Sequence, residues 1–307
     1  MRSSTRQKAG WCGAARSAGS LRAARADIAA LAPLAPLHTR AALDGIDEAT
    51  VALPDLPQVA CFDTAFHRTL TPAAATYALP REWNERFGLR RFGFHGLNVG
   101  WCAQQAARIL TAERSRRLVV CHLGSGCSVS AVLKGRSVDT TMGFTPLEGV
   151  PMATRSGSVD PGLLLHLLAS GITPGELDEA LNHRSGMLGL TGIAGQREEQ
   201  AACAGDERAQ LALDVLVRGV AGAVAAMTTA LGGLDGLVFS AGAGERSALL
   251  REAICARLGH FGIALDCAAN ARDRERIDAP GTDVAVLVVR AGEEIVVADE
   301  TARLLAR

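Results

Sequence analysis

The sequence predicts an α/β protein of two domains, and three observations lead to this prediction. Its 307 residues are enough for two hydrophobic cores. Two β-branched apolar runs, at residues 118–121 and 236–240, each end in a glycine-rich loop, and the later half of the chain alternates helix-like with strand-like segments. Aromatic residues make up only 4% of the chain, so small aliphatic residues must fill the cores, as is common around buried parallel strands.

Charge and hydrophobicity are those of an ordinary globular protein. The chain is 48% hydrophobic and 21% charged, with a net charge of +0. Nothing in this balance favours a nucleic-acid partner or a membrane surface. The longest apolar stretch, around residues 211–231, is interrupted by Asp214 and Arg218, which predicts a buried or amphipathic helix and not a membrane span.

The eight cysteines are scattered, and no two form a C-x-x-C pair. Cys61 and Cys121 lie within apolar strand patterns, where a cysteine usually serves as a small core residue. The pattern predicts neither a disulfide nor a zinc site, and it favours a reducing compartment, the cytoplasm.

The first 25 residues differ from the rest, because they carry six basic residues and no acid before Asp27. An organelle transit peptide has this composition. An irregular N-terminus, or a start codon set in the wrong place, is the simpler interpretation and the favoured one. Residues 1–27 are therefore expected to be irregular and non-native or disordered.

The remaining elements follow from periodicity, caps and turn residues. Strands are expected at 58–62, 118–121, 128–133, 136–140, 236–240 and 283–289. Helices are expected at 28–34, 41–51, 83–89, 99–110, 161–170, 174–181, 208–231, 247–258 and 295–306, and loops at 186–192, 241–245 and 291–294.

The segment from Arg117 to Pro161 organises the chain. A buried strand ends in the loop HLGSGCS, residues 122–128, whose Gly124 and Gly126 allow backbone N–H groups to face one anion. A second strand follows this loop, which excludes the common P-loop and dinucleotide motifs because both require a helix there. Arg155 stands farther on among small residues, where its planar fork could reach a phosphoryl group. Together these features favour nucleotide-phosphate chemistry.

Two other polar residues have open interpretations. Asp63 ends a predicted strand, where open α/β sheets bind ligands, but it could equally cap a following helix, and both roles can hold at once. His95 lies between Phe94 and Gly96 and could be a core histidine or a ligand contact. The glycine-rich turn after residue 240 precedes a predicted helix, which suits nucleotide contact.

Several long motifs resemble the acetate kinase family of acyl-phosphate kinases. They follow in the family's order from about residue 30 to the C-terminus, and they are APLH (35–38), VACFDTAFH (59–67), FGFHG (92–96), HLGSG (122–126), VDTTMGFTPLEG (138–149), TRSG (154–157) and FSAGAGE (239–245). The resemblance implies the two-domain actin/sugar-kinase/Hsp70 (ribonuclease H-like) fold. It also implies a kinase that uses ATP and Mg²⁺ to convert acetate or propionate to the acyl phosphate, with release of ADP, and that forms a homodimer through the second domain.

The resemblance also assigns roles to single residues. Arg155 would bind the phosphoryl and carboxylate groups, and His95 would hydrogen-bond the transferring phosphoryl group. Asp63 would orient the substrate and the magnesium ion, and Glu293 would be the glutamate linked to magnesium. The phosphates would lie at His122, Gly124, Ser125 and Gly126, the adenosine beside Arg197, Gly242, Ala243, Gly244 and Glu245, and the methyl end of the substrate in a pocket of Leu37, Phe94 and Pro146.

The chain also departs from the family pattern. The family's opening N-x-G-S-S-S-x-K loop and its H-R-x-V-H-G-G arginine have no counterpart here, and the usual H-G-T-S-H is replaced by HGLNV at residues 95–99. The first domain is therefore expected to be incomplete: residues 28–70, completed by a C-terminal helix at 295–307, with a second domain over 71–294. Its strand near Val59 would lack neighbours and expose an apolar edge.

Three hypotheses follow from these departures. The chain is an acetate or propionate kinase whose catalysis belongs to a longer form, or a catalytically deficient fragment, or another phosphotransferase of the same fold. The carboxylate-kinase motifs disfavour the last of these.

Overall fold

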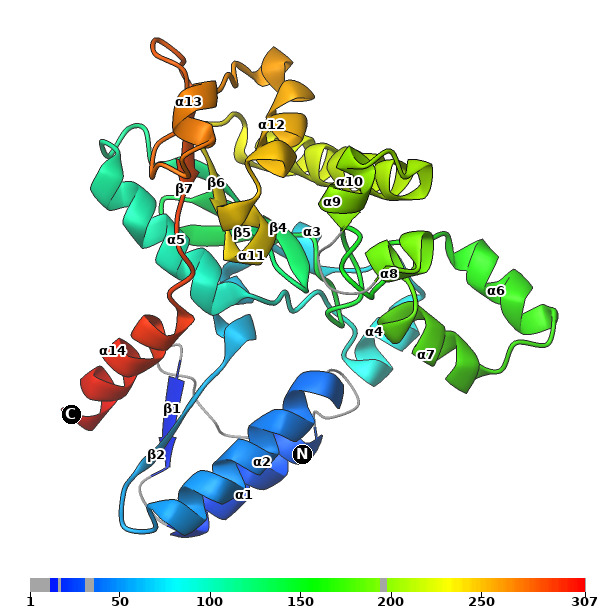
Figure 1. Cartoon of the computed structure of the whole chain (residues 1–307). Helices are drawn as coiled ribbons and strands as arrows, with labels where there is room; N and C mark the ends of the chain where they lie inside the picture. Colours follow the sequence, from blue (N-terminus) through cyan, green and yellow to red (C-terminus); the bar gives the residue numbers. More distant parts are fainter. Residues whose placement is uncertain (1–11, 16–17, 31–35, 194–197, 307) are drawn as a thin grey trace.

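The computed structural model describes the backbone of residues 12–15, 18–30, 36–193 and 198–306, and side chains for 23–30, 40–193 and 198–306. Figure 1 shows a larger body built on a five-stranded sheet and a smaller part that contains α1, α2, β1 and β2. The helix α14 lies where the two meet.

The larger sheet has the strand order β5-β4-β3-β6-β7. β3 is antiparallel to β4 and parallel to β6, β4 is antiparallel to β5, and β6 is parallel to β7. Lys134 and Gly135 join β4 to β5 with positive φ at both positions, as a tight hairpin turn requires. The strand bounds are β3 Arg117–Leu123, β4 Cys127–Leu133, β5 Arg136–Thr140, β6 Gly236–Ser240 and β7 Ala285–Val288.

Helices cover both faces of this sheet. Alternate residues of β3 serve two separate cores: Leu118 and Val120 pack with α5 (Gly96–Ile109), whereas Val119 and Cys121 pack with α10 (Glu207–Leu231) and α12 (Ala248–Ala256). This is the period of two that a strand buried on both faces shows. By length and composition α10 could cross a membrane, but it packs on the sheet, as the sequence predicted for a buried helix.

The remaining helices of the larger body connect these layers or extend from them. Their bounds are η2 Asp63–Thr69, α3 Pro72–Ala75, α4 Arg81–Phe87, α6 Pro161–Ala169, α7 Pro174–His183, α8 Gly186–Thr191, α9 Glu198–Cys203, α11 Ala241–Arg246, η3 Gly259–Phe261 and α13 Cys267–Asn270.

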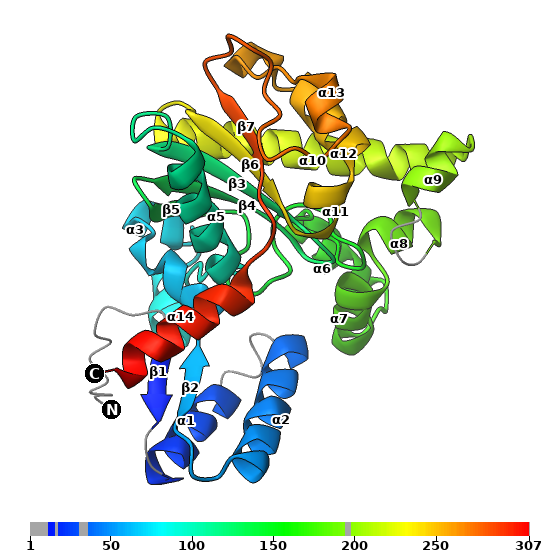
Figure 2. The same ribbon diagram turned by 60° about the vertical axis from the view of Figure 1, so that its left-hand side comes forward.

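The smaller part pairs two short antiparallel strands, β1 (Cys12–Ala15) and β2 (Gln58–Cys61). α1 (Ala18–Ala30) packs on α2 (Pro36–Ala52) and on β1, and Arg25 makes two hydrogen bonds of 2.6 and 2.5 Å to the Asp47 carboxylate. α14 (Glu293–Leu305) contacts β1, β2 and α5 (Figure 2).

Several sequence predictions are wrong in this region. Residues 12–15 and 18–27, expected to be irregular, form β1 and most of α1. β2, expected to lack neighbours, pairs with β1. Cys61 is disulfide-bonded, so the prediction that the chain has no disulfide is wrong, as is the interpretation of Cys61 as a free core thiol. Cys121 is buried and free as predicted.

Two predicted loops are helices. Within the predicted loop 186–192, residues 186–191 form α8, which begins at Gly186 with φ 60° and whose first turn is closed by the hydrogen bond from the Gly189 N–H to the Ser185 carbonyl. Residues 241–245 belong to α11, which Ala241 begins in the left-handed region at φ 65°. Both segments are rich in glycine, which has a low helix propensity, so the sequence predicted loops. The helices form because tertiary contacts, and not local propensity, stabilise them.

Candidate functional site

The site is built around the loop between β3 and β4. The Gly124 N–H donates to the Gly126 carbonyl at 3.0 Å, and the Ser125 carbonyl accepts from the Ala153 N–H at 3.2 Å. The first of these bonds engages one N–H that the sequence had assigned to an anion. The loop therefore presents a tight, fixed backbone, and an anion there would depend largely on neighbouring side chains.

Arg155 is the main cation beside this loop. Its side chain is buried, with the residue 8% exposed, and Nη1 donates to the Pro146 carbonyl at 2.8 Å. Within the part of the chain that the structure describes, no carboxylate lies within ion-pair distance of Arg155. A Cβ placed on Gly126 would lie 2.8 Å from Nη2, so the guanidinium borders the loop. Burial lowers the pKa of Arg155, and an anionic ligand would offset the cost of this buried charge.

Two histidines complete the group of donors. The rings of His95 and His122 stack at 3.9 Å between centroids and 14° between planes. His95 Nδ1 lies 3.0 Å from the Ser128 hydroxyl, and a Cβ on Gly126 would lie 3.2 Å from its Nε2. Burial, with a smaller contribution from His95, holds the pKa of His122 well below its usual value. His122 is therefore neutral, and both rings face the loop that Arg155 borders.

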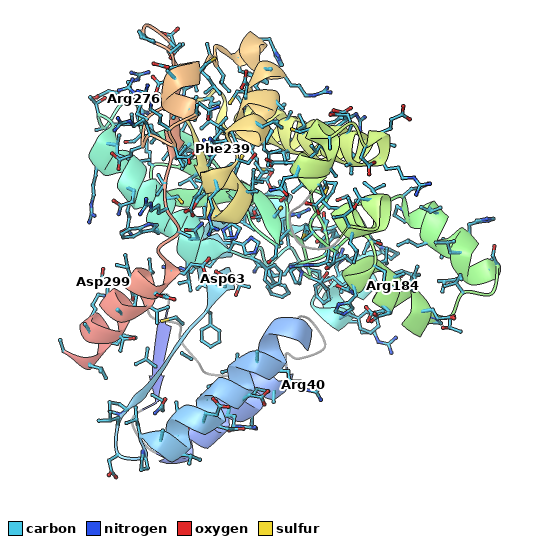
Figure 3. All side chains as sticks on the ribbon, viewed as in Figure 1. Arg40, Asp63, Arg184, Phe239, Arg276 and Asp299 are labelled. Carbon is cyan, nitrogen blue, oxygen red and sulfur yellow. The ribbon has the colours of Figure 1, made fainter. Side chains whose placement is uncertain are left out.

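Asp63 lies where β2 meets the larger body (Figure 3). Its carboxylate accepts from the backbone N–H of His95 at 2.6 Å and of Leu97 at 3.0 Å. It thus caps the beginning of α5, which is remote in sequence. The helix η2, in which Asp63 itself lies, has no side-chain cap, so the interpretation of Asp63 as the cap of the helix that directly follows it is wrong. Asp63 is a cap, as one alternative held, but of a different helix.

Glu293 is the first residue of α14. Although the residue as a whole is exposed, partial desolvation of its carboxyl raises the pKa, and the nearby charges of Asp63 and Glu294 raise it further. The two predicted metal residues therefore lie within electrostatic reach of each other. Within the described ranges, no group of three or more His, Cys, Asp or Glu side chains has the arrangement of a metal cage.

The predicted adenosine side borders a cavity of about 220 Å³ next to the phosphate loop. Gly124, Gly242 and Ala243 line it, together with apolar side chains of α10 and α12. Gly244 and Glu245 do not line it. Their carbonyls accept from buried Arg251, at 3.0 and 2.8 Å, and the Glu245 carboxylate accepts from the Ala291 N–H at 2.9 Å. Arg197 is outside the described residues.

The three residues predicted for the substrate's methyl end are only partly described. Phe94 is partly buried against the main core, and its carbonyl lies 2.9 Å from His67 Nε2. The Pro146 carbonyl accepts from Arg155. Leu37 belongs to α2, but its side chain is outside the described set.

Sequence reasoning missed the polar groups that hold these side chains in place. Buried Asn98 bonds both His122 and Ser240, and Ser128 bonds His95. The Tyr77 hydroxyl donates to Glu148 at 2.5 Å and, with Arg91, fixes the loop before Arg155. One signal for these groups was present in the sequence: residues 95–99 read HGLNV in place of the family's H-G-T-S-H, and Asn98 is one of the changed residues.

Comparison with known proteins gives consistent results. The model of the acetokinase family matches residues 22–299. The acetate kinase of Synechococcus sp. (strain JA-2-3B'a(2-13)) is 48% identical over 273 residues, which are 87% of this chain and 68% of that protein. The crystal structure of a propionate kinase from Francisella tularensis subsp. tularensis SCHU S4 has a TM-score of 0.88 at 37% identity and covers 94% of this chain and 74% of its own. The Porphyromonas gingivalis acetate kinase structure has a TM-score of 0.87 at 36% identity, with 96% and 74% covered.

Proposed function

Since the chain belongs to the acetokinase family, we propose that it transfers the γ-phosphoryl group of ATP to a short carboxylate such as acetate or propionate. The prediction of a kinase is confirmed, and so is the prediction of the actin-type fold with an incomplete first domain. The relatives include an acetate kinase and a propionate kinase, so the substrate is stated here as a class.

The observation that supports this reaction most strongly is the environment of Arg155. A buried guanidinium that bonds a carbonyl, and has no carboxylate partner among the described residues, favours an anionic ligand. It borders the Gly126 loop together with His95. Phosphoryl transfer to a carboxylate brings two anions together, so donors and cations at the point of transfer are the main requirement.

ATP and Mg²⁺ fit the residues present. Mg²⁺ in kinase sites is held by one or two carboxylates together with substrate phosphates and water, which suits Asp63 and Glu293 without a third protein ligand. The pKa of Glu293 is raised first by partial desolvation and then by the charges of Asp63 and Glu294, and a cation would relieve this repulsion. When bound, the ion would neutralise phosphate charge. The cavity beside Gly124, Gly242 and Ala243 would take the adenosine.

The chain's own residues would act as follows. A carboxylate is already ionised at neutral pH, so no general base is needed. Its oxygen attacks the γ-phosphorus, the bond to the bridging oxygen breaks, and ADP leaves with that oxygen. Arg155 would hold the phosphoryl and carboxylate oxygens in line, and His95 and His122 would donate to phosphate oxygens.

The test is turnover of the purified chain. Acyl phosphate formed from Mg-ATP and acetate, then propionate, is trapped with hydroxylamine, and Arg155→Ala serves as the control. Transfer that this substitution lowers by about 10³-fold or more supports the proposal. No transfer from a folded chain, or transfer unchanged in the Arg155 variant, contradicts it.

We further propose a homodimer. The chain's membership of a family of metabolic kinases favours the cytoplasm as its location, whereas the disulfide at Cys61 removes the argument drawn from the cysteines. α6 has no buried residue, and its Leu163, Leu165 and Leu168 are 47%, 68% and 37% exposed. A helix with this many exposed leucines favours association with another apolar surface, and a second copy of α6 supplies one. Light scattering of the purified chain tests the dimer.

A further inference from the structure

Asn98 connects three elements beneath the site. It lies near the beginning of α5 and is fully buried, with 0% of its surface exposed. Its amide nitrogen lies 2.9 Å from His122 Nδ1 on β3 and 3.0 Å from the Ser240 hydroxyl on β6. His122 and Ser240 are register partners in the parallel pair of β3 and β6, so one side chain bonds two adjacent strand ends.

The hydrogen bonds determine which nitrogen of His122 carries the proton. An amide nitrogen donates and does not accept, so His122 Nδ1 must be the acceptor. The Asn98 oxygen lies 3.8 Å from the Cys102 thiol, which can donate to it, and this agrees with the amide orientation. A neutral imidazole that accepts at Nδ1 has its hydrogen on Nε2.

The Nε2 side of His122 faces the phosphate loop. A Cβ on Gly124 would lie 3.6 Å from Nε2. His95 stacks on the ring, and the titratable groups that act on His122 are His95, which disfavours its protonation, and Asp63, which favours it less strongly. Burial is the largest influence and keeps the ring neutral.

We propose that Asn98 is a positioning residue that fixes His122 as the neutral Nε2–H tautomer, so that this ring always presents a hydrogen-bond donor to a phosphate oxygen. The identity of the ligand rests on the proposed function, but the tautomer does not. In the family pattern H-G-T-S-H a serine takes this position. A hydroxyl can donate or accept, so serine would not by itself select one tautomer.

The first experiment needs no turnover. Long-range ¹H–¹⁵N spectra of the ¹⁵N-labelled protein distinguish the tautomers of its seven histidines, and His122→Gln assigns the relevant signal. We expect His122 to remain Nε2–H from about pH 6 to pH 9. An Nδ1–H signal, or titration of His122 within this range, would overturn the proposal.

Two variants then separate positioning from a general structural role. Asn98→Asp replaces the donor with an acceptor, which should raise the pKa of His122 and place the proton of the neutral ring on Nδ1. kcat/KM for Mg-ATP should then fall about tenfold as pH rises through that new pKa, because Nε2 becomes an acceptor facing phosphate. Ser240→Ala keeps the Asn98–His122 bond and should leave the tautomer unchanged.

These measurements have distinct outcomes. A changed tautomer in the Ser240→Ala protein, or an unchanged one in folded Asn98→Asp protein, contradicts the proposal. If the Asn98 variant does not fold, the parent and the Ser240 variant still decide the tautomer. A parent with the Nε2–H tautomer but no phosphoryl transfer would contradict the proposed function and leave this inference intact.

Discussion

Adding one methyl group at Gly126 should disable the site without unfolding the protein. The new Cβ would lie 2.8 Å from Arg155 Nη2 and 3.2 Å from His95 Nε2. To reach an ordinary contact at 3.4 Å, the guanidinium must retreat by about 0.6 Å. A misplacement of about 1 Å can cost on the order of 10²-fold in rate, so the Gly126→Ala chain should lose between about tenfold and a hundredfold in kcat.

The matched control is Gly222→Ala on α10, an exposed position outside the site. A Cβ added there would meet no atom within 4 Å. We expect its kcat to stay within about threefold of the parent. Neither glycine has positive φ, so both variants should unfold within about 1 kcal/mol of the parent. Equal kcat in the two variants, measured by hydroxylamine trapping, would refute this reasoning.

Three further predictions concern separate parts of the molecule. Arg155→Met should abolish transfer and leave the thermal midpoint unchanged or higher, because a buried cation with no carboxylate partner among the described residues costs stability; a midpoint several degrees lower would contradict this. Glu293→Gln should raise the Mg²⁺ concentration needed for half-maximal activity. In the parent this requirement should rise as pH falls toward the raised pKa of Glu293, because protonation removes the ligand charge; an identical dependence in the Gln variant would assign it to another group. Leu165→Glu should convert the dimer to a monomer in light scattering, since a charge at this 68% exposed position disfavours apolar association. The matched control is Leu305→Glu, at a 41% exposed position on α14, which should leave the dimer intact.

The larger sheet was predictable because its signals are local. β3, β4 and β6 are apolar runs bounded by turn residues, and β5 follows directly after the Lys134–Gly135 turn. The predicted limits of these four strands differ from the observed ones by at most two residues. The Lys134–Gly135 turn and the long α10 were predictable for the same reason. Arg155 and the loop at Gly126 were both predicted to contact phosphate, which stays a prediction, and the structure places the guanidinium beside this loop.

What the sequence did not predict depends on contacts between remote segments. Asp63 caps a helix more than 30 residues away, whereas a sequence pattern can only suggest a cap for the next helix. α8 and α11 begin at residues in the left-handed region, which local propensity disfavours. The pairing of β1 with β2 joins two segments separated by both α1 and α2, and no local pattern marks such a pair.

The hydrogen bonds of Asp63 connect its structural role to the catalytic role that we propose for it. The N–H groups of His95 and Leu97 belong to the set that the first turn of a helix leaves without intrahelical partners. By accepting both, the carboxylate stabilises the beginning of α5 and holds the His95 backbone at φ 57°, a conformation that few residues other than glycine adopt. That backbone conformation sets where the His95 ring meets His122 and the Gly126 loop. The end of β2 therefore controls the geometry of the donors on the larger sheet, and loss of the Asp63 carboxylate would displace the histidine as well as remove a proposed magnesium ligand.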